Sequence, residues 1–327
     1  MKVMPNFRYF HPGSVAEAVN LGTAHPESRL LAGGTDLVVN LRRGLAVPSA
    51  VIDLGAIPEL AGIAEAGNDV RIGAGVTLAQ LANHPLIRHR FPALVSAALA
   101  VAGATHRVAA TVGGNLCQDT RCVIYNESDW WRTGNGFCRK CEGEVCHVVE
   151  QKDHCYATYH GDLAPVLMVL NAEIELIGPA GTRRLPLPAL FREEGDHHLT
   201  LLPGELLAAI VVPDTAGTVA GYAKVRIRKA IDFPLAAVAI ALERSGERLA
   251  GLRVAISGTN SAPLLVLTAD LLGRLWNEAL VEELAQAIRK TSSTVKTTNV
   301  SPSYRRRVLL ASARRLLNQL WEQAALP

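Results

Sequence analysis

The sequence lacks the patterns that identify several common classes of protein. Its N-terminus, MKVMPNFR, has no apolar run of the length that a secretory signal peptide needs. The longest uncharged apolar stretch, residues 91–104, is too short to span a bilayer. Aromatic residues make up only 5% of the chain and the formal net charge is only +3, so neither base stacking nor a basic field indicates nucleic-acid binding. We therefore expect a cytoplasmic protein that binds neither a membrane nor nucleic acid.

The common nucleotide-binding and hydrolytic motifs are also missing. No Gly-x-Gly-x-x-Gly is present, because Gly73-Ala74-Gly75 lacks the third glycine, and no phosphate loop ends in Gly-Lys-Ser/Thr. Neither His-Glu-x-x-His nor an order of Ser, His and Asp typical of hydrolases occurs. A dinucleotide bound by this chain would therefore not use a Rossmann or Walker site.

Cysteine is absent from most of the 327 residues, because all six lie between Cys117 and Cys155. A secreted protein stapled by disulfides is not usually built this way, whereas reduced thiols gathered in one segment indicate metal. The six are Cys117, Cys122, Cys138, Cys141, Cys146 and Cys155. Four thiolates can hold either Zn²⁺ or an iron–sulfur cluster. Spacing alone does not separate the two, although the C-x2-C at Cys138 and Cys141 slightly favours structural zinc.

What remains is typical of an α+β protein of two domains. At roughly 150 residues per domain the length suggests two, and strands alternate with helices through the first half. A segment rich in proline and charge, residues 185–213, predicts the boundary. Three strands are expected within residues 221–256, followed by helices over 281–289 and 304–324. In the last helix we expect leucines on the buried face and the arginines outside.

Two pairs of glycines have the pattern of phosphate-binding turns. Residues 32–36 read Ala-Gly-Gly-Thr-Asp and residues 111–115 read Thr-Val-Gly-Gly-Asn, and a strand is expected before each. Paired glycines let the backbone approach a ligand closely and present N–H groups to phosphate oxygens. Two such turns would suit the two phosphates of a dinucleotide, and two ordinary tight turns are the alternative.

These turns, Leu31 to Leu37 and Ala110 to Leu116, resemble the two FAD pyrophosphate motifs of molybdenum hydroxylase flavoproteins, the family of xanthine and carbon monoxide dehydrogenases. Residues 161–165, Gly-Asp-Leu-Ala-Pro, resemble the family's turn on the flavin side of FAD. Residues 224–232, with Tyr222 before them, are similar to the start of its C-terminal domain. The resemblance covers nearly the whole chain except residues 118–158.

The resemblance implies a fold and a set of FAD contacts. The expected fold is a p-cresol-methylhydroxylase-like FAD-binding domain of two α/β subdomains over residues 1–184, with residues 118–158 as an iron–sulfur insertion. A carbon-monoxide-dehydrogenase-flavoprotein-like domain, a three-stranded sheet plus helices, is expected over residues 214–327. The implied FAD contacts are Leu31, Ala32, Gly33, Gly34, Thr35, Asp36, Thr111, Gly113, Gly114, Asn115, Asp162 and Lys224.

The insert, residues 118–158, resembles that of the medium subunit of 4-hydroxybenzoyl-CoA reductase, which carries a [4Fe–4S] cluster besides FAD. The matching residues are 119–122, 130–132 and 137–138. The comparison implies that the cluster ligands are Cys122, Cys138, Cys146 and Cys155. It leaves Cys117 as a packing residue and Cys141 as an open alternative to Cys138.

The resemblance also implies partners. The chain would carry single electrons, with ferredoxin as donor, towards a large molybdopterin subunit and a small [2Fe–2S] subunit in a dimer of heterotrimers. The assembled enzyme would reductively dehydroxylate its substrate to benzoyl-CoA. The alternatives are a FAD subunit of a hydroxylating xanthine- or aldehyde-type dehydrogenase and a non-redox subunit with structural zinc.

Overall fold

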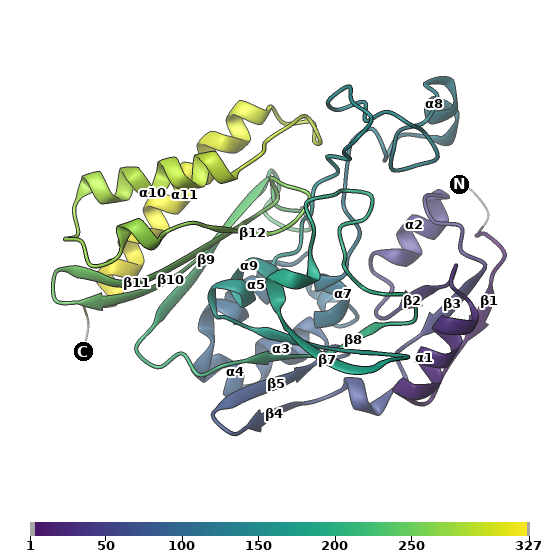
Figure 1. Cartoon of the computed structure of the whole chain (residues 1–327), viewed down its shortest axis with the longest axis horizontal. Coiled ribbons are helices and arrows are strands. Elements are labelled where there is room, and N and C mark those ends of the chain that lie inside the picture. The colour runs from purple at the N-terminus through teal and green to yellow at the C-terminus, as the bar shows by residue number, and fades with distance from the viewer. Residues whose placement is uncertain (1–3, 326–327) are drawn as a thin grey trace.

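Three β-sheets organise residues 4–325, the part of the chain that the computed structural model describes (Figure 1). The first sheet is parallel, has the order β1-β3-β2 and consists of β1 (Arg8–Phe10), β2 (Arg29–Leu31) and β3 (Ala50–Asp53). Parallel neighbours need crossover connections, which are supplied by helices α1 (Val15–Ala24) and α2 (Leu37–Arg43). The Ser14 side chain caps α1 by accepting the Glu17 N–H.

The second sheet is antiparallel and has the order β4-β5-β8-β6-β7. Its strands are β4 (Ile63–Ala66), β5 (Asp69–Gly73), β6 (Glu173–Gly178), β7 (Gly181–Pro186) and β8 (Leu206–Val212). The associated helices are α3 (Leu78–Asn83), α4 (Pro85–Arg90), α5 (Pro92–Ala100), α6 (Ala104–Arg107), α7 (Val112–Leu116) and α9 (Leu163–Val169). Every residue of α9 is buried, so this helix lies at the centre of the largest apolar core.

The third sheet is antiparallel and has the order β12-β11-β10-β9. It consists of β9 (Val219–Val225), β10 (Ala236–Ser245), β11 (Arg248–Ser257) and β12 (Leu264–Val266). Helices α10 (Glu278–Thr291) and α11 (Pro302–Gln323) pack together, and α11 covers β9 and β10. On the other side, α5 contacts β9 and α9 contacts β10 and β11, so the sheet is fixed to the first two-thirds of the chain.

The observed elements differ from the sequence prediction at several places. The three strands expected within residues 221–256 are present as β9, β10 and β11, and short β12 is additional. The segment predicted to be the domain boundary, residues 185–213, contains β8, whose residues are all buried between β5 and β6. In α11 the leucines are buried as expected, but Arg305 is buried too and donates to four carbonyl or hydroxyl oxygens, so the expectation of outward arginines was wrong there.

The insert projects from the body of the molecule and carries the short helix α8 (Asp129–Gly134) (Figure 1). Its two ends lie side by side, because the backbones of Arg121 and Thr158 exchange hydrogen bonds of 2.8 and 2.7 Å. Among residues 4–325, no helix combines the length and the apolar character that a membrane crossing requires.

Candidate functional site

A cavity of about 610 Å³, called here the large cavity, gathers most of the predicted FAD contacts. Its walls come from the loop after β2, the segment from α6 to α7, the start of α9, and β9 with the loop that follows it. The predicted residues on its surface are Ala32, Gly33, Gly34, Thr35, Asp36, Thr111, Gly113, Gly114, Asn115, Asp162 and Lys224. Leu31 is not among them, because it lies within β2, where its carbonyl accepts the Leu54 N–H; its neighbour Leu30 lines the cavity instead.

The first glycine turn follows β2 as predicted. Gly34 has φ +71°, a left-handed conformation that glycine adopts without strain. Within residues 4–325 no protein acceptor is found for the backbone N–H groups of residues 33–36, which all lie on the cavity wall. Several adjacent N–H groups without protein acceptors form a site suited to an anion such as a pyrophosphate.

The second glycine turn differs from the prediction. It follows helix α6 rather than a strand, and its residues form the short helix α7 with Thr111 as N-cap. The N–H of Gly113 donates to Ala74 O (2.8 Å) and that of Gly114 to Thr111 Oγ1 (3.0 Å). This turn therefore shapes the cavity, and the Thr111 hydroxyl can still donate there, since a hydroxyl can accept and donate together.

The two turns are pressed against neighbouring backbone. A Cβ on Gly33 would lie 1.8 Å from the carbonyl oxygen of Ala109, just before the second turn. A Cβ on Gly113 would lie 2.8 Å from the Ala74 Cβ. The glycines are thus required as much by close packing of the protein on itself as by the approach of a ligand.

A buried ion pair lies at another part of the large cavity. Lys224, on β9, donates to Asp162 at the start of α9 (Nζ to Oδ2, 2.9 Å), and both side chains are 4% exposed. The Tyr222 hydroxyl donates to the other carboxylate oxygen of Asp162 (2.5 Å). Burial raises the pKa of the Asp162 carboxyl and lowers that of the Lys224 ammonium, and in each case the partner's charge opposes the shift. The predicted residues Asp162 and Lys224 are therefore brought together.

A second, smaller cavity, the thiol cavity, is lined by the four cysteines that the sequence resemblance singled out. Cys122, Cys138, Cys146 and Cys155 are each at most 7% exposed. Burial raises the pKa of Cys122 to about 11 and that of Cys155 to about 12. Within residues 4–325, no three His, Cys, Asp or Glu side chains are arranged around the position of a single metal ion.

The other two cysteines do not line the thiol cavity. The Sγ atom of Cys141 accepts from Nη1 of Arg132 (3.5 Å), a side chain only 2% exposed. Cys117 lies on the wall of the large cavity and packs against the main core. The metal-ligating side chains along the thiol cavity are thus four thiols and the His147 imidazole, a set that suits zinc or an iron–sulfur cluster by its chemistry.

The sequence did not predict the role of the loop of residues 192–198. This loop contacts residues 155–157, called here the Cys155 arm. Glu194 Oε1 accepts the Cys155 N–H (2.6 Å), and the Gly195 N–H donates to the Cys155 carbonyl (2.8 Å). A Cβ on Gly195 would lie 2.6 to 2.7 Å from backbone atoms of Cys155 and Ala157. The run Glu-Glu-Gly-Asp-His-His was the available signal, because so many polar residues around a glycine indicate a loop with specific partners.

The aromatic and histidine residues of the insert differ in how they lie relative to the thiol cavity. Trp130 is 85% exposed, so it neither shields the thiols nor anchors the insert. His154 pairs with Glu194 (3.1 Å) and does not line the thiol cavity. His147 does line it, and its Nε2 contacts Phe137 O (2.6 Å).

Comparison with known proteins agrees with the architecture. Residues 5–215 match the family described as FAD binding domain in molybdopterin dehydrogenase, and residues 221–320 match the CO dehydrogenase flavoprotein C-terminal domain. The sequence is 32% identical to the aldehyde oxidoreductase FAD-binding subunit PaoB of Escherichia coli, over 82% of this chain and 86% of that one. It is 28% identical to the carbon monoxide dehydrogenase medium chain of Hydrogenophaga pseudoflava, over 99% and 100%.

A solved structure of carbon monoxide dehydrogenase from Hydrogenophaga pseudoflava is similar over 99% of this chain and 100% of its own, with 26% identity and a TM-score of 0.82. This match and the two family matches confirm the predicted fold class. The predicted domain limits of 1–184 and 214–327 stay a prediction.

Proposed function

The chain belongs to the family of FAD-binding medium subunits of the molybdenum hydroxylases, and from this premise we propose that the large cavity is its FAD site. The N–H groups of residues 33–36 and the Thr111 hydroxyl supply donors for a pyrophosphate. The cavity has the size of cofactor pockets, about 300 to 1,000 Å³. FAD, when bound, supplies a group that exchanges electrons singly or in pairs.

The remaining residues of the site orient the flavin and exclude water. The Asp162–Lys224 pair is buried and fixed by Tyr222, so it presents a defined arrangement of charge on the cavity wall. Lys224 comes from β9 in the third sheet, and Asp162 lies at the start of α9 in the first two-thirds of the chain. The cofactor would therefore bind between these two parts of the chain. The loop after β9 contributes Ile231, Asp232 and Phe233 to the opening.

For the complex, we propose an electron-transfer role in a hydroxylating dehydrogenase of the aldehyde, xanthine or carbon monoxide type. Its support is the similarity to subunits and medium chains of such enzymes, including nicotine 6-hydroxylase of Paenarthrobacter nicotinovorans (26% identical over 96% of this chain). The proposed partners are a large molybdopterin subunit and a small [2Fe–2S] subunit. The relatives described above favour this assignment over 4-hydroxybenzoyl-CoA reductase.

The thiol cavity supports a second candidate, a [4Fe–4S] cluster held by Cys122, Cys138, Cys146 and Cys155. The observation behind it is four buried thiols around one space. A cluster, when bound, would carry single electrons. With it, the chain would take electrons from ferredoxin for reductive dehydroxylation to benzoyl-CoA, as the sequence resemblance implies. The comparisons do not support the cluster, so its test has to be chemical.

An anaerobic absorbance spectrum with flavin, iron and zinc analysis of the purified full chain distinguishes the candidates. One flavin per chain without iron is the result expected for the hydroxylating type. One flavin with about four iron atoms supports the cluster. Zinc without flavin or iron would refute the redox function.

The substrate of the complex is tested separately. The chain is co-purified with its partner subunits and assayed for oxidation of an aldehyde, xanthine or carbon monoxide, and for reduction of 4-hydroxybenzoyl-CoA with reduced ferredoxin. Turnover in an oxidative assay supports the hydroxylating assignment, and turnover only with the thioester would overturn it.

A further inference from the structure

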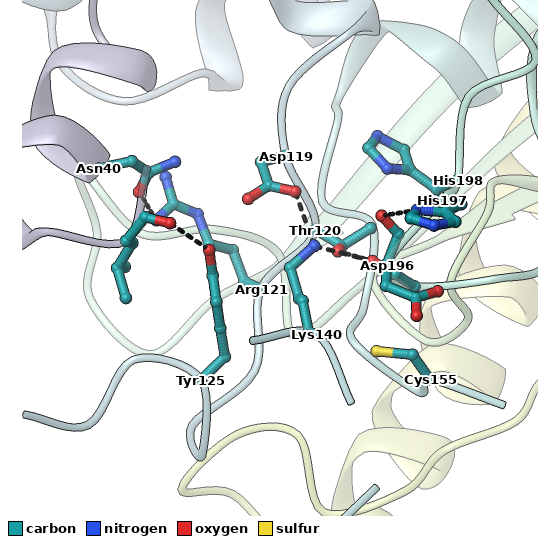
Figure 2. A network of polar contacts seen from close by, with 12 residues as sticks. Asn40, Asp119, Thr120, Arg121, Tyr125, Lys140, Cys155, Asp196, His197 and His198 are labelled. Carbon is teal, nitrogen blue, oxygen red and sulfur yellow. Dashed lines mark hydrogen bonds and ion pairs between the residues drawn. The ribbon is translucent and has the colours of Figure 1, made fainter. Parts of the chain in front are cut away.

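A series of polar contacts connects the wall of the large cavity to the wall of the thiol cavity. Asp36, on the large cavity, accepts the backbone N–H of Asp119 at Oδ2 (3.0 Å). The Asp119 side chain in turn accepts from Lys140 (Oδ1 to Nζ, 2.8 Å), and Lys140 lines the thiol cavity. Figure 2 shows Asp119 and Lys140 between Arg121 and Cys155. Along this path Asp119 is therefore the one residue between the two cavity walls.

Arg121 belongs to the wall of the large cavity and to the base of the insert at once. Its guanidinium pairs with Asp36 and donates to Asn40 Oδ1 (3.0 Å), and it lies over the Phe233 ring at 5.2 Å. Its backbone exchanges both hydrogen bonds with Thr158. A shift of this residue would therefore move both strands of chain that enter and leave the thiol site.

Lys140 lines the thiol cavity. Its side chain is 6% exposed and donates to Asp119 and to the carbonyl of Gly195 (2.9 Å), with the Tyr125 ring at 5.2 Å. The Gly195 N–H donates to the carbonyl of Cys155. A buried ammonium is stable only with its hydrogen bonds made, so these contacts specify one position for the Cys155 arm.

We propose that Arg121 and Lys140 are positioning residues that couple the two sites: occupancy of the large cavity by FAD favours the arrangement in which the four thiols face one cavity. Filling the large cavity removes water from around the Asp36–Arg121 pair, and the lower local dielectric strengthens that pair. By linkage, order in the thiol site strengthens FAD binding by the same factor. The inference rests on the proposed FAD site and needs no cluster.

The test measures thiol reactivity rather than enzyme activity. The full chain is stripped of metal with a chelator under anaerobic conditions, and FAD binding is measured first by titration. Iodoacetamide alkylation of each cysteine is then followed by mass spectrometry with and without saturating FAD, at one pH. We expect FAD to slow alkylation at least about fivefold at four positions: Cys122, Cys138, Cys146 and Cys155. Cys141, outside the thiol cavity, is the internal reference and should not respond.

Variants separate coupling from structural damage. In Lys140→Gln and Arg121→Met, the ratio of rates with and without FAD should approach one, and Lys140→Arg should restore a part of it. Lys152→Gln, an exposed lysine of the same insert, should keep the full ratio. General loosening, or a changed thiol pKa, alters both rates alike and cancels in the ratio.

Two results would overturn the coupling while leaving the FAD site standing. One is FAD binding to the unaltered chain without protection of the thiols. The other is full protection that persists in both Lys140→Gln and Arg121→Met. Absence of FAD binding in the first titration would instead refute the proposed function and the coupling with it.

Discussion

Only glycine fits at position 33, because any side chain there would collide with the folded backbone. The clash would be with the carbonyl of Ala109, which is backbone and cannot rotate away. The glycine pattern itself was readable from the sequence, because glycine pairs after a strand are a local signal. Its reason was not readable, because the neighbour that enforces it is 76 residues away.

At Gly33 we predict that Gly33→Ala destabilises the fold by about 1 to 3 kcal/mol, the range typical of overpacking. It should also weaken FAD binding at least tenfold, because the first turn would be pushed away from the second. Denaturant unfolding and FAD titration measure the two effects. Gly13→Ala is the matched control, since a Cβ there meets nothing within 4 Å. Normal FAD affinity in Gly33→Ala would show that the turn does not contribute to the cofactor site.

Which four of the six cysteines line the thiol cavity also depends on the surroundings of single residues. The sequence indicated a cysteine site but left Cys138 and Cys141 open, because their spacing suits either. In the structure Cys138 lines the thiol cavity, whereas the sulfur of Cys141 accepts from Arg132, nine residues earlier in the insert.

For the second candidate, in which the thiol cavity holds metal, we predict that Cys141→Ser leaves the metal content unchanged whereas Cys138→Ser loses it, because of these two cysteines only Cys138 lines that cavity. Iron and zinc analysis of anaerobically purified protein measures the effect, with flavin content as a control for folding. The reverse outcome would exchange the roles of the two cysteines.

Among the elements, β8 and α7 show where local pattern misled. The richness of residues 185–213 in proline and charge predicts a domain boundary, although the segment contains Leu-Leu-Ala-Ala-Ile-Val-Val, the continuous apolar run of a strand buried on both faces. The helix α7 contains two glycines, which have low helix propensity. It forms because Thr111 caps it and the chain around Ala74 and Val76 accepts its first N–H groups. Tertiary contacts therefore override local preference at both places.

The loop of residues 192–198 makes an element-scale prediction. In Gly195→Ala the new methyl group would collide with the backbone of Cys155 and Ala157, so the Cys155 arm should shift. We expect metal content to fall by more than half while FAD is retained. Gly134→Ala, in the insert but with open space around it, should keep its metal. Equal metal content in both variants would show that the loop does not position Cys155.

At the scale of the whole molecule, two buried histidines tie distant segments together. His160 Nδ1 contacts the Pro234 carbonyl (2.9 Å) and His198 Nε2 the Gln118 carbonyl (2.9 Å). Burial lowers the pKa of His160 to about 3 and that of His198 to about 4. The unfolded chain therefore binds protons that the folded chain does not, below about pH 6.5.

It follows that the free energy of unfolding falls as the pH drops from 6.5 towards 4, by about 1.4 kcal/mol per pH unit for each histidine that stays neutral. Urea unfolding at pH 7.0, 6.0 and 5.0 measures the slope. His198→Asn should reduce the slope, whereas His89→Gln, at an exposed position, should leave it unchanged. A slope that is the same in His198→Asn would show that this group does not contribute.

The overall architecture could be predicted from the sequence, because the glycine turns and the strand pattern are spread over nearly its full length. The polar path from Asp36 to Lys140 could not, because it joins the first glycine turn to two points of the insert that lie far apart in the sequence. Such contacts form only when the fold brings distant residues together, so the local sequence does not predict them.

The paired hydrogen bonds between Arg121 and Thr158 have a consequence for how the chain could be edited. The insert leaves and re-enters the body of the molecule at adjacent points. The course of the remaining backbone therefore does not depend on how long the insert is. Excising it and closing the gap with a two-residue turn would leave every sheet order intact. A metal-binding loop of different length could be joined at the same two residues. The insert could therefore be replaced while the flavoprotein fold around it is kept.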